Sequence, residues 1–201
     1  MTVLKDIINF IFLPIRVMLK TEQVRRLGLI PVVDDRHNAV LKHVKGTLLD
    51  IGCGENLLVK QYGTGIGVDV YPWKGIDVLV DTTHLPFPSD FFDTITLIAS
   101  LNHIPSQIRN KVLSEVKRVL KDDGKVLLTM LTPSISYVGH NFLWRWSDPD
   151  LQERGMKEGE TWGFTPTQIS SILLKSGLRL IHHEKFVYGL NHLYVAQKIS
   201  L

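Results

Sequence analysis

The sequence is poor in several features that mark particular classes of protein. It has one cysteine, Cys53, in 201 residues, so no disulfide can form within the chain and a secreted disulfide scaffold is excluded. The N-terminal apolar run, residues 7–13, ends at Pro14 and is too short to span a bilayer. A formal net charge of +3 is too small to indicate a nucleic-acid-binding module, which carries a dense basic face. These absences favour a cytoplasmic globular protein.

With 44% hydrophobic and 21% charged residues, the chain has the composition of a domain with one substantial core. Residues 1–45 hold eight Lys or Arg against four Asp or Glu, so the positive charge is concentrated there. Apolar residues recur at helical spacing over 4–19, and Pro14 predicts a kink or break. A polar connector is expected around 34–38, followed by a short helix over 39–44. We therefore predict an N-terminal helical segment ahead of a main domain, residues 46–201.

Beyond residue 46 the pattern changes to strands that alternate with helices. Strands are predicted over 47–51, 64–70, 77–80, 94–99, 125–131, 178–186 and 192–198, and helices from about 56 and over 106–120 and 165–175. A turn at 122–124 is expected before the fifth strand. Such alternation is typical of right-handed crossovers in a parallel sheet. The predicted fold class is α/β and Rossmann-like: a mostly parallel seven-stranded sheet with a C-terminal antiparallel hairpin and helices on both faces.

A glycine turn, Gly52-Cys53-Gly54, follows the first predicted strand. The missing side chains at both glycines let backbone amides approach a ligand closely. A dinucleotide-binding fingerprint would need a third glycine at position 57, where the chain has Leu57, so NAD and FAD are disfavoured.

Two carboxylates follow the next two predicted strands. Asp69 comes 17 residues after Gly52, where it can accept hydrogen bonds from both hydroxyls of a ribose. Asp81 can accept from an adenine amine, beside the backbone amide of Thr82. Because the carboxyl ends of parallel strands share one edge of the sheet, these three corners together would surround an adenosine.

The same residues belong to a longer pattern. From about residue 45 to 198 the chain resembles the class I S-adenosylmethionine-dependent methyltransferases, in particular the small-molecule, methyltransferase type 11-like branch. The matching segments are LDIGCG at 49–54, GVD at 67–69, DTTHLPF at 81–87, FD at 92–93, LNHIP at 101–105 and LKDDGK at 120–125. The resemblance implies S-adenosyl-L-methionine as the cofactor and methyl transfer as the activity.

The resemblance also implies a set of cofactor-binding residues. The glycine loop of the family corresponds to Gly52 and Gly54, and its ribose acid to Asp69. Its adenine contacts correspond to Asp81 and Thr82. The full expected set is Asp50, Gly52, Cys53, Gly54, Asn56, Asp69, Val70, Asp81, Thr82, Ile98 and Ala99, with the last two facing the methionine part.

Three members of this set have further interpretations. Asn56 stands where the family often has a third small residue, and asparagine can adopt the left-handed region or cap a helix, so cofactor binding is expected to survive. Asp50 is interpreted as an orienting residue beneath the turn. Cys53 is interpreted as a small packed side chain and not as a nucleophile.

Methyl transfer from a sulfonium is an in-line displacement in which positioning supplies most of the acceleration, so a base is optional. For an acceptor that must lose a proton, the candidate base is His103, which resembles the histidine often found at this place in the family. The alternative is that His103 only orders its loop. No metal site is expected at His182-His183-Glu184, because successive residues of a strand point to opposite faces.

Residues 132–162 are predicted to form a loop-rich insertion on the substrate side. Its candidate substrate-binding residues are Tyr137, His140, Trp144 and Trp146, with core packing as the alternative. No Pro-Pro-aromatic motif of the kind that marks enzymes acting on exocyclic nucleic-acid amines follows the fourth strand. No cysteine outside the glycine turn could attack a pyrimidine. We therefore expect a small-molecule or lipid-like acceptor and no nucleic-acid partner.

Two questions stay open at this point. Arg16, Lys20, Arg25 and Arg26 follow the first apolar helical face, so the N-terminal segment can be a cap over the cofactor pocket, or residues 1–26 can contact a membrane peripherally. The domain can also be a non-catalytic S-adenosylmethionine-binding regulatory or scaffold module. Nothing in the sequence indicates an oligomeric state.

Overall fold

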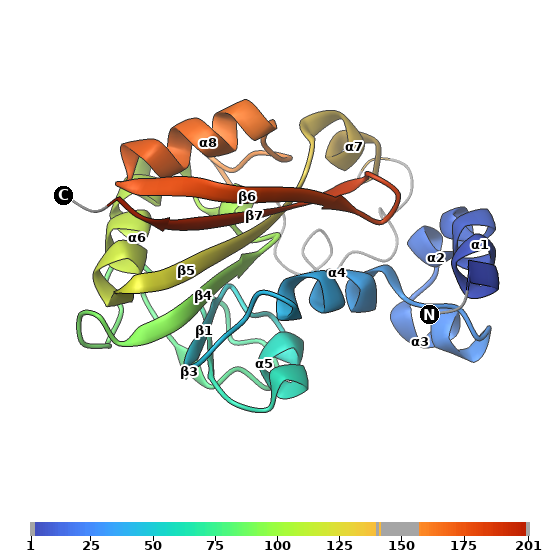
Figure 1. The fold of residues 1–201 in the computed structure, drawn as a ribbon, viewed down its shortest axis with the longest axis horizontal. Coiled ribbons are helices and arrows are strands. Elements are labelled where there is room, and N and C mark those ends of the chain that lie inside the picture. Colours follow the sequence, from blue (N-terminus) through green and yellow to red (C-terminus); the bar gives the residue numbers. More distant parts are fainter. Residues whose placement is uncertain (1–2, 140, 142–156, 200–201) are drawn as a thin grey trace.

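The computed structural model describes residues 3–139, 141 and 157–199. They form a seven-stranded sheet in the order β3-β2-β1-β4-β5-β7-β6 (Figure 1). The strands are β1 (Leu48–Ile51), β2 (Ile66–Asp69), β3 (Val78–Leu79), β4 (Phe92–Ile98), β5 (Leu120–Leu131), β6 (Leu178–Phe186) and β7 (Asn191–Lys198). Neighbours are parallel except that β7 is antiparallel to both β5 and β6. The predicted fold class is confirmed.

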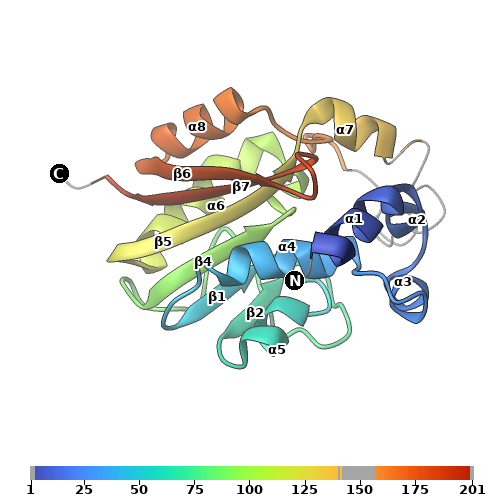
Figure 2. The same ribbon diagram turned by 45° about the vertical axis from the view of Figure 1, so that its right-hand side comes forward.

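Helices cover both faces of the sheet (Figures 1 and 2). They are α1 (Val3–Ile11), α2 (Leu13–Met18), α3 (Thr21–Arg26), α4 (Val32–Leu41), α5 (Leu57–Tyr62), α6 (Ser106–Val119), α7 (Pro133–Val138) and α8 (Pro166–Lys175), with a short 3₁₀ turn η1 (Leu101–His103). Buried side chains of α6 and α8 form one core with the sheet, and those of α4 and α5 form a second core on the opposite face. All four residues of β1 are buried, as expected for a central parallel strand.

The start of α8 follows from its first residues. Thr165 accepts a hydrogen bond from the backbone N–H of Gln168, whose side chain accepts from the Thr165 amide, and Pro166 occupies the first turn. Gly177, just past the end, has a φ of +72°, which a residue with a side chain rarely adopts. The predicted helix over 165–175 is confirmed.

Two sequence-based boundaries are wrong. Residues 34–38, expected as a connector, lie inside α4, because Asp34 and Asp35 occupy its first turn, where carboxylates are stabilised by the helix dipole. The expected turn at 122–124 lies inside β5. Phe92 of β4 pairs with Leu120, and Thr94, two residues later, pairs with Lys125. Residues 121–124 therefore form a bulge within a strand that begins at Leu120.

The N-terminal helices gather beyond one end of the sheet, next to α4 (Figure 2). The break between α1 and α2 occurs as predicted, with Pro14 in the first turn of α2. Arg16 is buried and bonds to the carbonyl oxygens of Asn9 and Ile30 and to the carboxylate of Asp35. This side chain therefore ties the first two helices to α4.

Candidate functional site

A cavity of about 860 Å³ opens at the carboxyl ends of β1, β2 and β4. The glycine turn after β1, the segment after β2, Thr82 after β3 and the residues after β4 all line it. Helix α4 contributes Val33, Arg36 and His37 to the wall of the cavity. No described residue of α1 to α3 lines the cavity, so within the N-terminal segment it is α4 that borders it.

The glycine turn depends on the missing side chains. Gly52 has a φ of +73°, and a Cβ there would lie 2.6 Å from the Cβ of Ser100, so no larger residue fits. The Ser100 hydroxyl donates to the carbonyl of Ile51 at 3.0 Å and holds the residues after β4 against this turn. Gly54 has a φ of +53° and open space beside it. The predicted close approach of backbone to a ligand is therefore sterically available here.

Asp69 is placed as the sequence predicts, at the end of β2 and facing the cavity. One carboxylate oxygen accepts the backbone N–H of Gly54 at 3.0 Å, and the other accepts that of Tyr71 at 3.0 Å. The residue is 7% exposed. Since each carboxylate oxygen has two lone pairs, both can still accept from ribose hydroxyls while the backbone bonds hold the group in place.

Asp50 lies beneath the turn, fully buried at the cavity wall. The hydroxyl of Thr96 donates to its carboxylate at 2.6 Å. Burial raises the pKa of Asp50 to about 7, the Thr96 bond opposes the shift, and the charge of Asp69 adds to it. The carboxyl group is therefore held near the balance between its neutral and charged forms at physiological pH.

Cys53 also lines the cavity. Burial and the neighbouring carboxylates of Asp50, Asp69 and Asp77 raise the pKa of its thiol to about 12. A thiol with this pKa stays protonated near pH 7 and is a poor nucleophile. The environment thus favours the interpretation of Cys53 as a packed side chain.

Asn56 adopts the left-handed conformation at the start of α5, with a φ of 61°. Its side chain does not line the cavity and makes no cap bond. Instead the amide donates to the carbonyl of Gly75 and to the carboxylate of Asp77. It covers Gly67 so closely that a Cβ there would lie 2.0 Å from the Asn56 oxygen. The structure places Asn56 as a brace between the loop and β2, away from the expected cofactor contact.

The two residues expected at the adenine end are separated. Thr82 is nearly buried and lines the cavity, as does Val70. The side chain of Asp81 is 67% exposed and does not line the cavity. Its carboxylate accepts the backbone N–H of Thr83 at 2.8 Å, and hydrogen bonds with Thr83 hold the pKa of Asp81 below its usual range. The structure thus brings Thr82 to the site and leaves Asp81 facing solvent.

Ile98 and Ala99 lie at the end of β4 on the cavity wall, as expected. Ala99 has a φ of +51°, and its N–H donates to the hydroxyl of Thr129 at 3.1 Å. This unusual backbone turns the chain sharply after β4 and leads into η1, which ends at His103.

His103 lines the cavity together with a residue that sequence reasoning missed, Glu160. The Nδ1 atom of His103 lies 3.3 Å from a carboxylate oxygen of Glu160, whose side chain is fully buried. Backbone bonds from Ser106 to Gly159 and from Thr161 to Asn102, each 3.0 Å, fasten this segment to η1 and α6. No signal in the sequence pairs these residues, because 57 positions separate them and Glu160 lies within the predicted loop-rich insertion.

The other predicted substrate residues are only partly placed. Tyr137, on α7, is 54% exposed and packs edge-on against Trp162 at 6.3 Å between ring centroids, and it does not line the cavity. His140, Trp144 and Trp146 lie outside the described residues. Lining residues that the sequence did not single out include Arg36, His37, Tyr71, Trp73, Ile104, Pro105, Ile108 and Lys157.

The profile of a methyltransferase-domain family matches residues 24–183, which is most of the chain. The chain belongs to this family. Together with the fold, this makes it a class I S-adenosylmethionine-dependent methyltransferase with S-adenosylmethionine as its cofactor. The residues fit that cofactor. An open glycine turn and the nearly buried Asp69, whose carboxylate oxygens can still accept hydrogen bonds, border one cavity.

Individual relatives agree on the family and differ in acceptor. A tRNA (carboxymethyluridine(34)-5-O)-methyltransferase from Arabidopsis thaliana is 36% identical over 97 residues, which are 41% of this chain and 23% of the relative. A ubiquinone/menaquinone biosynthesis C-methyltransferase, UbiE, from Ralstonia pickettii is 36% identical over 50 residues, 25% of this chain and 20% of the relative. The chain thus matches under a quarter of the length of either relative.

A solved structure has a similar fold. It is the Burkholderia thailandensis 1,6-didemethyltoxoflavin-N1-methyltransferase with bound 1,6-didemethyltoxoflavin and S-adenosylhomocysteine. It superposes with a TM-score of 0.60 at 15% identity, over 82% of this chain and 77% of that chain.

Changing Asp69 to Ala is expected to weaken binding of S-adenosylhomocysteine by about 2 kcal/mol, roughly 30-fold, because charge-assisted bonds to the ribose are lost. Titration calorimetry measures this directly. Asp81→Ala is the matched control, since its exposed carboxylate lies off the cavity and its removal is expected to change affinity far less. Equal affinity of wild type and Asp69→Ala would show that the ribose site is elsewhere.

Proposed function

We propose that this methyltransferase acts on a small-molecule or lipid-like acceptor and that His103 takes the proton of that acceptor. The observation that carries the proposal is the apolar wall next to His103 in the cavity. This wall consists of Ile104 and Pro105, the two residues that follow His103, and of Ile108 in the first turn of α6. Apolar walls with few polar groups are typical of sites for small organic ligands.

The pairing with Glu160 supports a role for His103 in proton transfer. A carboxylate that accepts from Nδ1–H fixes the tautomer in which Nε2 carries the lone pair. The same carboxylate stabilises the imidazolium that forms when Nε2 takes a proton. When bound, S-adenosylmethionine supplies an electrophilic methyl group, and the chain positions the acceptor and removes its proton.

The N-terminal helices add support for an apolar acceptor. Their exposed large hydrophobic residues are Val3, Leu4, Ile7, Ile8, Phe10, Ile11, Phe12, Ile15 and Met18. We propose that this surface, the N-terminal apolar surface, contacts a membrane from the cytoplasmic side. None of the described helices is long and apolar enough to cross a bilayer.

The basic residues expected to assist this contact are mostly engaged within the protein. Arg16 is buried against Asp35, so it cannot reach lipid headgroups. Arg25 pairs with Asp34 at 2.8 Å. The proposed contact therefore rests on apolar insertion more than on charge.

A screen of acceptors with methyl-labelled S-adenosylmethionine tests the proposal. The arms are isoprenoid or other lipid-linked acceptors, water-soluble metabolites carrying hydroxyl, amine or acidic carbon groups, and unmodified tRNA. Turnover is expected with an apolar small molecule or a lipid-like acceptor. Turnover with tRNA alone would contradict the proposed acceptor class. Cofactor binding without turnover in every arm would favour the regulatory or scaffold alternative.

Co-sedimentation with liposomes tests the membrane contact. The double substitution Leu4→Asp and Ile11→Asp is expected to move the protein from the pellet to the supernatant, because two side chains that are 67% and 63% exposed become charged. Leu174→Asp is the matched control, since Leu174 is 62% exposed on the distant helix α8. Equal recovery of wild type and double variant in the supernatant would end the membrane proposal.

A further inference from the structure

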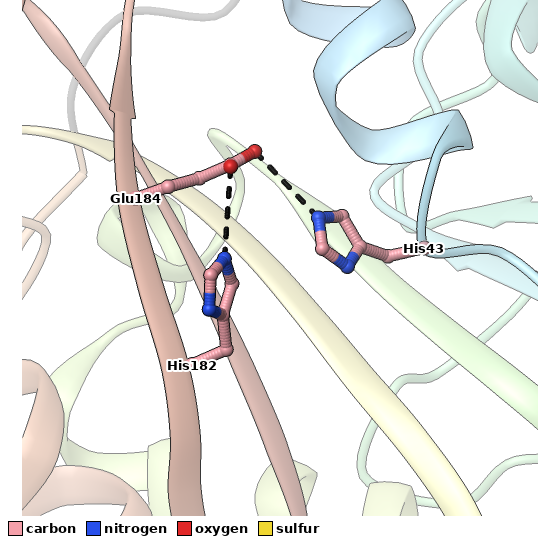
Figure 3. A group of neighbouring side chains, drawn as sticks. All are labelled: His43, His182 and Glu184. Atoms are coloured by element: carbon pink, nitrogen blue, oxygen red, sulfur yellow. Dashed lines mark ion pairs between the residues drawn. The ribbon is translucent and has the colours of Figure 1, made fainter.

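Three side chains that commonly bind metals meet outside the cofactor cavity. His43 follows α4, and His182 and Glu184 lie on β6 (Figure 3). One possible ligand atom from each residue lies within 4.8 Å of the other two. None of the three lines the cofactor cavity, so the cluster is separate from the methyl-transfer site.

A β-bulge places both β6 residues on the face that α4 covers. Leu180 pairs with Ala196 of β7, and His182 pairs with the next residue, Val195, so β6 has one extra residue between them. Ala196 belongs to the core under α6 and α8, whereas Val195 belongs to the core under α4. Directly paired residues share a face, so His182 faces α4. Glu184, two residues on, faces the same way.

The sequence argument against a metal site applies to successive residues of β6 and does not cover this cluster. That argument considered neighbouring positions, and His183 does point away, toward His192 and Tyr194. Alternate positions of a strand share a face, however, and the third group comes from a segment about 140 residues earlier in the chain. Pairing of α4 with β6 is a tertiary contact that the local pattern does not encode.

Two distances within the cluster are longer than hydrogen bonds and close to the separation of metal ligands. The Nε2 atom of His43 lies 3.6 Å from one carboxylate oxygen of Glu184, and the Nε2 atom of His182 lies 3.6 Å from the other. Both distances are beyond the range of about 2.7 to 3.2 Å for a hydrogen bond. Ligand atoms around a tetrahedral ion with bonds of about 2.0 Å are separated by about 3.3 Å. Each of the two separations is thus about 0.3 Å longer than a ligand–ligand edge, and binding through a single oxygen of Glu184 needs a small rotation of its carboxylate.

We propose that His43, His182 and Glu184 bind a divalent first-row transition metal, with zinc as the representative ion. Two imidazoles and one carboxylate are a donor set that zinc accepts, with water in the fourth position. The side chains are 24%, 46% and 34% exposed, so an ion can enter and a water can complete the coordination. The metal would join the end of α4 to β6.

Such a bridge has a consequence for the cofactor cavity. The helix that ends next to His43 contributes Val33, Arg36 and His37 to the cavity wall. Bound metal would therefore brace one wall of the methyl-transfer site from outside it. The ion takes no part in the transfer itself.

Zinc titration of the full chain, first stripped with a chelator, tests the proposal. Calorimetry in a buffer that does not bind zinc is expected to give one bound ion per chain. Thermal denaturation is expected to show a rise in Tm of about 5 °C at a hundredfold excess over Kd, because the ion binds the folded state. Cobalt is expected to give the visible absorption of a tetrahedral site.

Single substitutions His43→Gln, His182→Gln and Glu184→Gln are each expected to weaken zinc binding roughly 100-fold and to abolish the cobalt spectrum. His84→Gln is the matched control, since it removes a histidine that is 71% exposed and does not belong to the cluster. All four variants are first compared with wild type by circular dichroism without metal. Absence of stoichiometric zinc binding by wild type, or unchanged affinity in Glu184→Gln, would overturn the proposal.

Discussion

His103→Gln is expected to lower kcat about 100-fold on an acceptor that must lose a proton, with little change in affinity for S-adenosylhomocysteine. Glutamine keeps a polar side chain of similar length but cannot accept a full proton near neutral pH. His103 lies in the cavity with its Nδ1 atom against a buried carboxylate, which is the geometry of an oriented base. Steady-state kinetics with calorimetry of the product complex separate the two effects. A variant with unchanged kcat would leave His103 as a residue that only orders its loop.

Glu160 is a positioning residue in this scheme, and its own variant tests that role. Glu160→Gln is expected to lower kcat less than loss of the histidine does. The loss is expected in kcat with little change in KM, because the amide does not fix the tautomer of His103 as the carboxylate does. Glu158→Gln is the matched control on the same segment, where the side chain is exposed. Equal kcat values for wild type and Glu160→Gln would contradict the orienting role.

Asp50→Asn is expected to stabilise the protein at pH 8 relative to wild type. Burial raises the pKa of Asp50 from 3.8 to about 7, so between these values the folded state holds a proton that the unfolded state has lost. The free energy of unfolding of the wild type therefore falls as pH rises from about 4 to about 7. A shift of about three units corresponds to about 4 kcal/mol as an upper bound. The asparagine variant has no carboxyl group at this position, so it does not lose this part of its stability as the pH rises. Its side-chain oxygen can keep the hydrogen bond from the Thr96 hydroxyl.

Urea unfolding at pH 5 and pH 8 measures this effect. The difference in stability between variant and wild type is expected to grow in favour of the variant at the higher pH. Asp123→Asn is the matched control, because Asp123 is exposed on the bulge of β5. A difference that is the same at both pH values would show that the folded and unfolded states bind the proton of Asp50 equally.

The architecture of the sheet was accessible from the sequence, since it is encoded in local periodicity. Apolar strands alternating with amphipathic helices predicted a mostly parallel sheet, and Thr165 with Pro166 marked the start of α8. The predicted start of α4 was wrong because the polar composition of residues 34–38 suggested a connector. Asp34 and Asp35 look like a connector by polarity, but their charges favour the first turn of a helix and pair with arginines outside it.

The sequence by itself indicated the family and the cofactor through the resemblance of its motifs. It also indicated the corner where the glycine turn meets Asp69, because turn geometry and strand ends are properties of short segments. Only the tertiary structure decided which polar groups meet. It paired His103 with Glu160, brought His43 to β6, buried Arg16 and turned Asp81 to solvent. The physical reason is that these contacts depend on how elements distant in the sequence pack against one another. They also depend on single-residue irregularities such as the bulge in β6. Such a bulge moves the following side chains to the other face of the sheet without changing the hydrophobic pattern of the sequence.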